Sequence, residues 1–283
     1  MNGGIPRPLK LWLAAGLCFL YGPIASVILF SFNESKLVTV WAGFSTKWYA
    51  ALFENEQILS AAALSLRIGL VSGVLAVILG TMVAVVMSRF GPFRGRALLS
   101  GLATAPLVMP EVITGLSLLL LFVAMEQAVG WPAGRGVTTI VIAHTTFSLA
   151  YVAVIVQSRL VGMDRSIEEA ALDLGARPAK VFFVITLPLI LPALVSGFLL
   201  AFTLSLDDLV IASFVSGPGA STLPMVIYSK VRLGLSPEIN ALATLMVVVV
   251  ALGVGAAGFL MARAHRLRMG DEQLAAAEGE PQS

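Results

Sequence analysis

Long apolar runs separated by short polar segments constrain this chain more than any other feature of its sequence. The runs cover about residues 11–32, 59–88, 97–125, 137–160, 189–215 and 239–262. A helix needs about 20 apolar residues to cross a hydrocarbon core that is about 30 Å thick. Overall, 58% of the 283 residues are hydrophobic and only 12% are charged, which excludes an ordinary soluble protein. We therefore predict an all-α polytopic membrane protein with six transmembrane helices, the first of which is too long for a cleaved signal peptide.

The distribution of Lys and Arg residues predicts the orientation of these helices. Six spans place both termini on one side of the membrane. If that side is the cytoplasm, the inner segments carry twelve basic residues and the outer segments carry five, in agreement with the positive-inside rule. We expect a cytoplasmic N-terminus at residues 1–10, a transmembrane domain at 11–262 with a cytoplasmic loop at 161–188, and a cytoplasmic tail at 263–283.

The cytoplasmic loop carries the signals of a helix, a turn and a second helix. Ser166 and Glu169 have the spacing of a capping box, in which each side chain satisfies a free backbone N–H at the helix start. Gly175 is typical of the left-handed residue that ends a helix. Pro178 suits the first turn of the second helix, and we expect Pro188 to limit the length of that helix.

The spacing of this loop resembles the signature of permease subunits in ATP-driven bacterial importers, the binding-protein-dependent transport inner-membrane component family. The signature reads Glu-Ala-Ala, three residues, Gly, nine residues, Ile, one residue and Leu-Pro. Every position matches: Glu169, Ala170, Ala171, Gly175, Ile185, Leu187 and Pro188. The resemblance implies a type I importer permease fold, in which the helix that begins at Ser166 docks on a separate ATPase. The alternative, that Glu169 only caps a helix and the alanines only pack, leaves the full spacing unexplained.

Four further segments resemble spermidine/putrescine importer permeases, and most of all the second permease subunit of putrescine importers. These segments are Ser31–Asn33, Ala105–Pro110, Phe202–Asp208 and Asn240–Thr244. The resemblance implies a subunit of the bacterial inner membrane that forms half of a translocation pathway for a small cationic substrate, a polyamine and specifically putrescine. It also implies a homologous permease as heterodimer partner, two ATPase subunits and a periplasmic polyamine-binding protein. ATP and Mg²⁺ are expected on the ATPase subunits, no cofactor on this chain, and no nucleic acid as partner.

The motifs of common enzymes are missing from the sequence. It contains no Walker A motif, no His-Glu-x-x-His and no Gly-x-Ser-x-Gly. The two histidines, His144 and His265, stand apart from any pattern of metal ligands, so no metal site is indicated. We expect a non-catalytic subunit in which His144 makes a polar contact between helices.

Three acidic residues, Glu111, Asp207 and Asp208, fall inside the predicted membrane spans. A charged side chain in lipid costs about 3 kcal/mol, so such residues usually face the interior of a helix bundle or water. Two interpretations remain open. The acids either line a path for a cation or hold together a kinked helix or a subunit interface.

Prolines and glycines near these acids predict bends that are candidates for a gate or hinge: Pro106, Pro110, Gly217 and Pro218. The acids also leave alternative functions open. An importer permease for a different cationic solute fits the same residues. A proton-coupled secondary transporter would use Asp207 or Asp208 as a proton relay, although it leaves the loop signature unexplained.

Overall fold

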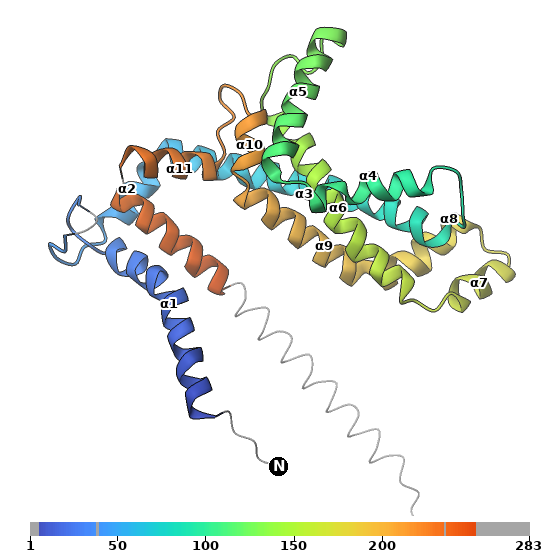
Figure 1. Cartoon of the computed structure of the whole chain (residues 1–283), viewed down its shortest axis with the longest axis horizontal. Helices are drawn as coiled ribbons and strands as arrows, with labels where there is room; N and C mark the ends of the chain where they lie inside the picture. Colours follow the sequence, from blue (N-terminus) through green and yellow to red (C-terminus); the bar gives the residue numbers. More distant parts are fainter. Residues whose placement is uncertain (1–5, 38–39, 235, 253–283) are drawn as a thin grey trace, which may run out of the picture. The chain divides into compact units, whose positions relative to one another are not determined.

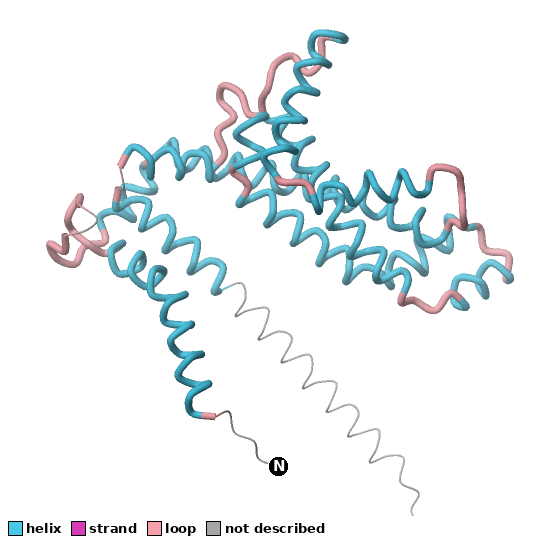
Figure 2. Tube along the Cα trace, viewed as in Figure 1, coloured by secondary structure: helices cyan, strands magenta, loops and turns pink. Residues whose placement is uncertain are grey.

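The structure is a computed structural model that describes residues 6–37, 40–234 and 236–252. Within these ranges the chain forms helices joined by loops, with a single isolated β-bridge between Asn33 and Phe44 (Figure 2). It divides into two compact units, Met1–Asn55 with Lys230–Ser283 and Glu56–Ser229, which we describe one at a time.

The larger unit contains most of the helices that Figure 1 labels. They are α3 (Glu56–Arg89), α4 (Arg96–Val108), α5 (Glu111–Val129), α6 (Val137–Val161), α7 (Ser166–Asp173), α8 (Pro178–Val181), α9 (Leu187–Asp207) and α10 (Val210–Val215). A π-helical turn, η1 (Phe182–Thr186), joins α8 to α9. Helix α11 (Leu223–Leu233) follows α10.

Helices α3, α6 and α9 pack against one another and form the centre of this unit (Figure 1). Glycines on α3 allow the close approach: a Cβ added to Gly69 or Gly73 would lie 3.1 Å from a ring carbon of α9. Small residues at helix contacts are typical of membrane proteins, in which packing rather than the hydrophobic effect drives helix association. The packed helices are therefore those that the apolar runs predict.

The third predicted span, residues 97–125, is two helices, and the break between them lies at Pro110, where the sequence predicts a bend. Helix α4 ends at Val108 and α5 begins at Glu111 after Pro110, which takes the N-cap position. The residue before a proline avoids the helical conformation, and here Met109 is extended. Pro106 lies inside α4 and does not end that helix.

The fifth predicted span also differs from the structure, because the expected continuous helix over residues 189–215 is wrong. Helix α9 ends at Asp207, Asp208 is extended with ψ 120°, and α10 starts at Val210. The expected limit at Pro188 is wrong as well, since the chain stays helical from Pro178 to Asp207. Pro188 lies in the first turn of α9, directly after the π-helical turn, where a missing N–H is tolerated.

The smaller unit contains α1 (Arg7–Ser31), α2 (Lys47–Glu54) and a helix over Pro237–Leu252. The buried side chain of Asn33 organises the loop between α1 and α2. Its Nδ2 donates to the Val40 carbonyl at 2.7 Å and its Oδ1 accepts from the Ala42 N–H at 3.0 Å. Its carbonyl accepts from Trp48 Nε1 at 2.7 Å, which fixes α2 to the end of α1.

Five helices of the described ranges are long and apolar enough to cross a membrane: Pro8–Ser31, Glu56–Arg89, Glu111–Val129, Val137–Val161 and Pro178–Asp207. The helix Pro237–Leu252 covers most of the sixth predicted span. The remainder of that span and the predicted tail at 263–283 lie outside the described residues.

Candidate functional site

Helix α7 carries the first half of the loop signature, and its start differs from the prediction. Arg165 already has helical backbone angles, so Ser166 is the first residue inside the helix and caps nothing. The predicted capping box is therefore wrong. Instead, the Asp164 carboxylate accepts the Ser166 N–H at 2.9 Å, and this bond holds the pKa of Asp164 below its usual value. Glu169 is exposed, and its own N–H donates to the Arg165 carbonyl.

The end of α7 agrees with the prediction. Gly175 has a φ of +84°, the left-handed conformation that glycine adopts without strain. The Ala176 N–H donates to the Ala171 carbonyl at 3.0 Å, and the Gly175 N–H donates to the Leu172 carbonyl at 2.9 Å. These two bonds form a Schellman motif, which satisfies the last carbonyls of the helix and turns the chain sharply.

The surface of α7 is open to solvent, because none of its residues is buried. Ile167 and Leu172 on the helix and Leu174 at its C-cap are exposed, as is Ala170 of the signature, whereas Ala171 is half-buried. A short helix between two membrane spans that presents apolar side chains to water is typical of a docking surface. The geometry of α7 thus provides a surface for a partner.

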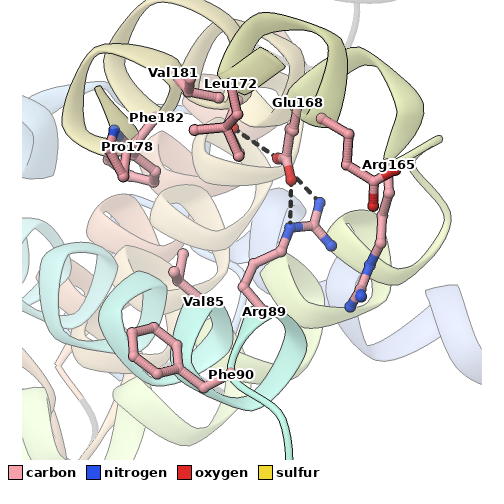
Figure 3. Close-up of a pocket in the computed structure, with 11 residues that line it drawn as sticks. Val85, Arg89, Phe90, Arg165, Glu168, Leu172, Pro178, Val181 and Phe182 are labelled. Carbon is pink, nitrogen blue, oxygen red and sulfur yellow. Dashed lines mark hydrogen bonds and ion pairs between the residues drawn. The ribbon is translucent and has the colours of Figure 1, made fainter. Parts of the chain in front are cut away.

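Glu168, a residue that the sequence analysis did not identify, anchors α7 to the membrane helices. Glu168, next to the signature Glu169, points away from the solvent and toward Arg89, the last residue of α3 (Figure 3). Arg89 Nη2 donates to Glu168 Oε1 at 3.1 Å, and Arg89 Nε makes an ion-pair contact of 2.8 Å with Glu168 Oε2. Thr186 Oγ1 donates to the same Glu168 Oε1 at 2.7 Å.

The second half of the signature lies beside this contact. Ile185 is the fourth residue of η1 and is half-buried, while Leu187 and Pro188 open α9. A cavity of about 350 Å³ separates α7 from the end of α3, and Arg89, Glu168 and Thr186 are among the residues that line it (Figure 3). The second half of the signature therefore lies where the π-helical turn continues into α9, next to the contact between Thr186 and Glu168.

The two adjacent aspartates have different environments. The Asp208 side chain is 8% exposed, and its Oδ2 lies 3.0 Å from His144 Nε2. The same carboxylate accepts the N–H groups of Ile211 at 3.1 Å and Ala212 at 2.7 Å, so it caps α10. His144 Nδ1 lies 2.6 Å from Ser205 Oγ, which makes His144 the interhelical contact that the sequence predicts. Asp208 thus joins α6, α9 and α10.

Asp207 and Glu111 have exposed side chains at the two breaks of the helices. Asp207 is the last residue of α9, and Glu111 is the first residue of α5. Helix α5 packs against α10, where Gly115 lies close to Ile211: a Cβ added to Gly115 would be 3.3 Å from the Ile211 Cα. Each acid is four residues before a residue of this contact in the sequence, so the fold brings both breaks to the same part of the unit.

Gly217 and Pro218, the other hinge candidates, follow Ser216, the C-cap of α10. A Cβ at Gly217 would fall on the carbonyl group of Arg135 in the loop before α6. In addition, Thr139 Oγ1 donates to the Val215 carbonyl at 2.7 Å. Gly217 therefore permits a close contact between two loops.

Known proteins resemble this chain over most of its length. It is 61% identical over 263 residues to the "Putrescine transport system permease protein PotI" of Escherichia coli (strain K12), covering 93% of this chain and 94% of that protein. It is 41% identical over 237 residues to the "Spermidine/putrescine transport system permease protein PotC" of Escherichia coli (strain K12), covering 84% of this chain and 87% of that protein.

Solved structures share the fold at low identity. One is a chain of a bacterial ABC transporter involved in the import of the acidic polysaccharide alginate, with a TM-score of 0.70, 16% identity, and coverage of 90% of this chain and 98% of that chain. Another is a chain of the MetNI methionine ABC transporter, with a TM-score of 0.58, 19% identity, and coverage of 73% and 95%.

The family described as "Binding-protein-dependent transport system inner membrane component" matches residues 76–270, which include the loop signature and both helix breaks. Together with the relatives and the membrane-spanning helices, this match defines a multi-pass permease subunit of the inner membrane. The chain belongs to the binding-protein-dependent transport system inner membrane component family.

Proposed function

We propose that this chain is the transmembrane permease subunit of an ATP-driven polyamine importer, with putrescine as its substrate. The observation that carries the proposal is α7: an exposed helix with apolar side chains, closed by a Schellman motif at Gly175 and held to the membrane helices by Glu168. The names of the two relatives support a polyamine as the substrate.

In this proposal α7 and both termini face the cytoplasm. A homologous permease completes the pathway, and two ATPase subunits each bind ATP and Mg²⁺. When ATP closes the ATPase pair, the subunit that holds α7 displaces it, and the permease pair opens toward the periplasm. A binding protein then releases the polyamine into the pathway, and ATP hydrolysis restores the inward-facing state. This chain itself binds no nucleotide and catalyses no reaction.

The exposed acids provide the chemistry for a cation. Putrescine carries an ammonium group at each end, and a carboxylate in a low-dielectric path attracts such a group strongly. Asp207 and Glu111 are free to do so, because both side chains are exposed at the helix breaks. The Asp208 carboxylate is occupied by His144 and two backbone N–H groups, so its role is to position α10.

The proposal is tested by uptake of radiolabelled putrescine into proteoliposomes. These contain the chain with its partner permease, ATPase and binding protein, with or without internal ATP. We expect uptake that requires ATP and that spermidine, but not a neutral amino acid, inhibits. If the binding protein stimulates ATP hydrolysis but no putrescine is taken up, the proposal that the substrate is a polyamine is refuted. Uptake that follows a proton gradient and ignores ATP would favour the secondary transporter instead.

The role of α7 is tested by Gly175→Ala. A non-glycine residue at a φ of +84° costs roughly 1–2 kcal/mol, so the Schellman turn should loosen and uptake should fall. The control is Gly162→Ala, which changes a glycine of the same loop with an ordinary φ of −78°. Equal uptake by both variants would refute the role of the turn.

The substrate path is tested by comparing two adjacent substitutions. Asp207→Asn should raise the KM for putrescine about tenfold, which corresponds to about 1.4 kcal/mol of lost binding. Asp208→Asn should instead reduce the amount of folded protein, because it disturbs the cap of α10. The same loss of folded protein in both variants would contradict the assignment.

A further inference from the structure

We propose that Glu168 is a positioning residue that transmits the movement of α7 to the membrane helices. It acts through Arg89 and Thr186, and we call these three residues the Glu168 junction. The inference rests on the proposed function, since it concerns how a partner that pushes or pulls α7 would change the transmembrane path. It assigns this role to a residue outside the loop signature.

The first connection of the junction leads to α3. Arg89 is the last residue of this 34-residue helix, and its guanidinium reaches both oxygens of the Glu168 carboxylate. The Nε approach of 2.8 Å is a charge contact without the alignment of a hydrogen bond, whereas Nη2 donates a directed bond at 3.1 Å. Two contacts from one planar group fix orientation as well as distance, which a single lysine could not do.

The second and third connections lead to α6 and α9. Arg89 Nη1 donates to the carbonyl of Leu160 near the end of α6 at 3.1 Å. Thr186, which is 4% exposed, donates to Glu168 and closes the π-helical turn that leads directly into α9. The junction therefore ends on the three helices that pack together at the centre of the unit.

The backbone of α7 does not need to touch α3 for this transmission. It packs against α8 and η1, whereas side chains make the connection to α3. Besides the Glu168–Arg89 pair, Arg165 donates to the carbonyl of Ser88. Both links originate in the first turn of α7 or directly before it, so a displacement of this helix pulls on the end of α3.

The burial of the junction supports a mechanical role. The side chains of Arg89 and Glu168 are only 17% and 13% exposed. Water and salt screen such a pair less than an exposed one, and removal of one partner leaves a partly buried charge without its counterpart. The neighbouring cavity of about 350 Å³ lies between α7 and α3 (Figure 3). Because this cavity keeps the helices apart beside the junction, the contact between α7 and α3 is made by the side chains of Glu168 and Arg89.

A merely stabilising ion pair would have a different signature from a transmitting one. Loss of a stabilising pair reduces the amount of assembled complex, while each remaining complex still moves substrate for every ATP that it hydrolyses. Loss of a transmitting pair leaves hydrolysis intact but separates it from transport. The decisive quantity is therefore the number of putrescine molecules imported per ATP hydrolysed by the assembled complex.

The experiment measures this ratio in proteoliposomes that contain the full complex with binding protein. The variants are Glu168→Gln, Arg89→Gln and the double variant. We expect each single variant to lower the ratio about fivefold or more, the lower end of the coupling found between linked sites. The double variant should lower it no further than the single ones, because both residues act through one contact. The control is Arg94→Gln, which removes an exposed charge from the loop between α3 and α4 and should leave the ratio within about twofold of the wild type.

Two results would overturn the inference. One is an unchanged ratio in both single variants, and the other is a double variant whose loss equals the product of the two single losses. If the glutamine variants fail to assemble, Glu168→Asp and Arg89→Lys keep the charges, alter the geometry and are judged by the same ratio. The wild-type complex separates this inference from the proposed function, because ATP-dependent uptake there stands whatever the variants show.

Discussion

The contact between α3 and α6 at Gly80 offers a sharp test of the packing. A Cβ added to Gly80 would lie 2.9 Å from both Cβ and Cγ1 of Val152 and 3.1 Å from the backbone nitrogen of Ala153. All three atoms belong to the rigid part of α6, so no flexible side-chain end can move aside. Gly80→Ala therefore forces the two helices apart or strains them.

The expected magnitude follows from two opposing effects. Carbon atoms in contact are normally about 3.5–4.0 Å apart, so the helices must separate by roughly 0.6–1.1 Å at this point. Overpacking of this kind costs about 1–3 kcal/mol. Alanine returns up to about 1 kcal/mol through its higher helix propensity. Net destabilisation should thus be about 0–3 kcal/mol. A control that shares the propensity gain isolates the packing cost.

The control is Gly101→Ala on α4, where nothing lies within 4 Å of an added Cβ. Thermal unfolding of the isolated chain in lipid nanodiscs should place Gly80→Ala several degrees below Gly101→Ala, at about 2–4 °C per kcal/mol. Gly80→Leu and Gly101→Leu should widen the gap. Equal or higher stability of the Gly80 variants would refute the helix contact as described.

Three further predictions concern other parts of the larger unit. His144→Ala should lower the free energy of unfolding by about 1.5–3 kcal/mol in thermal denaturation, because the buried Asp208 carboxylate loses a hydrogen-bond partner. Gly217→Ala should reduce the yield of folded protein in size-exclusion chromatography, since its Cβ would collide with the Arg135 carbonyl. The Asp164 carboxyl should titrate with a midpoint below the usual aspartate pKa of about 3.9 in ¹³C NMR. Because this pKa is depressed, its contribution to α7 is present above the usual pKa of about 3.9 and is lost as the pH falls through the folded value.

Each of these predictions has a matched control. Thr138→Ala changes an exposed residue of α6 and should leave the unfolding temperature unchanged. Gly91→Ala adds a Cβ where nothing lies within 4 Å and should preserve the yield. Asp164→Asn removes the NMR signal and so assigns it. A stable His144→Ala, a well-folded Gly217→Ala or an Asp164 midpoint above 3.9 would contradict the respective contact.

The sequence predicts the uninterrupted membrane helices well. For α3 the prediction of 59–88 compares with Glu56–Arg89, and for α6 the prediction of 137–160 compares with Val137–Val161. The physical reason is that the thickness of the bilayer sets the length of an apolar run, whatever the rest of the chain does. The left-handed Gly175 at the end of α7 was also predicted, because the freedom of glycine to adopt a positive φ is a local property of the residue.

The break between α9 and α10 was harder to predict than the break at Pro110, because apolar residues and no proline surround it. The end of α9 at Asp207 depends on Asp208, whose carboxylate caps α10 and contacts His144, 64 residues earlier in the chain. A sequence pattern over a few residues cannot reveal a contact between residues that are so far apart in the chain. Pro188 misled the prediction for a related reason: a π-helical turn, which is rare, accommodates it within a continuous helix.

Two pairs of adjacent acids lie within the described residues, and in each pair the fold gives the two carboxylates opposite roles. Glu168 turns inward to Arg89 while Glu169 is exposed, and Asp208 is held by His144 while Asp207 is exposed. Neighbouring residues on a helix point about 100° apart, so one can serve the interior and the other an outside partner. In each pair the sequence alone cannot assign the roles, because the inward acid is defined by a partner many residues away. Substitution of the inward acid should therefore change coupling or assembly, and substitution of the outward acid should change the affinity for a partner or for putrescine.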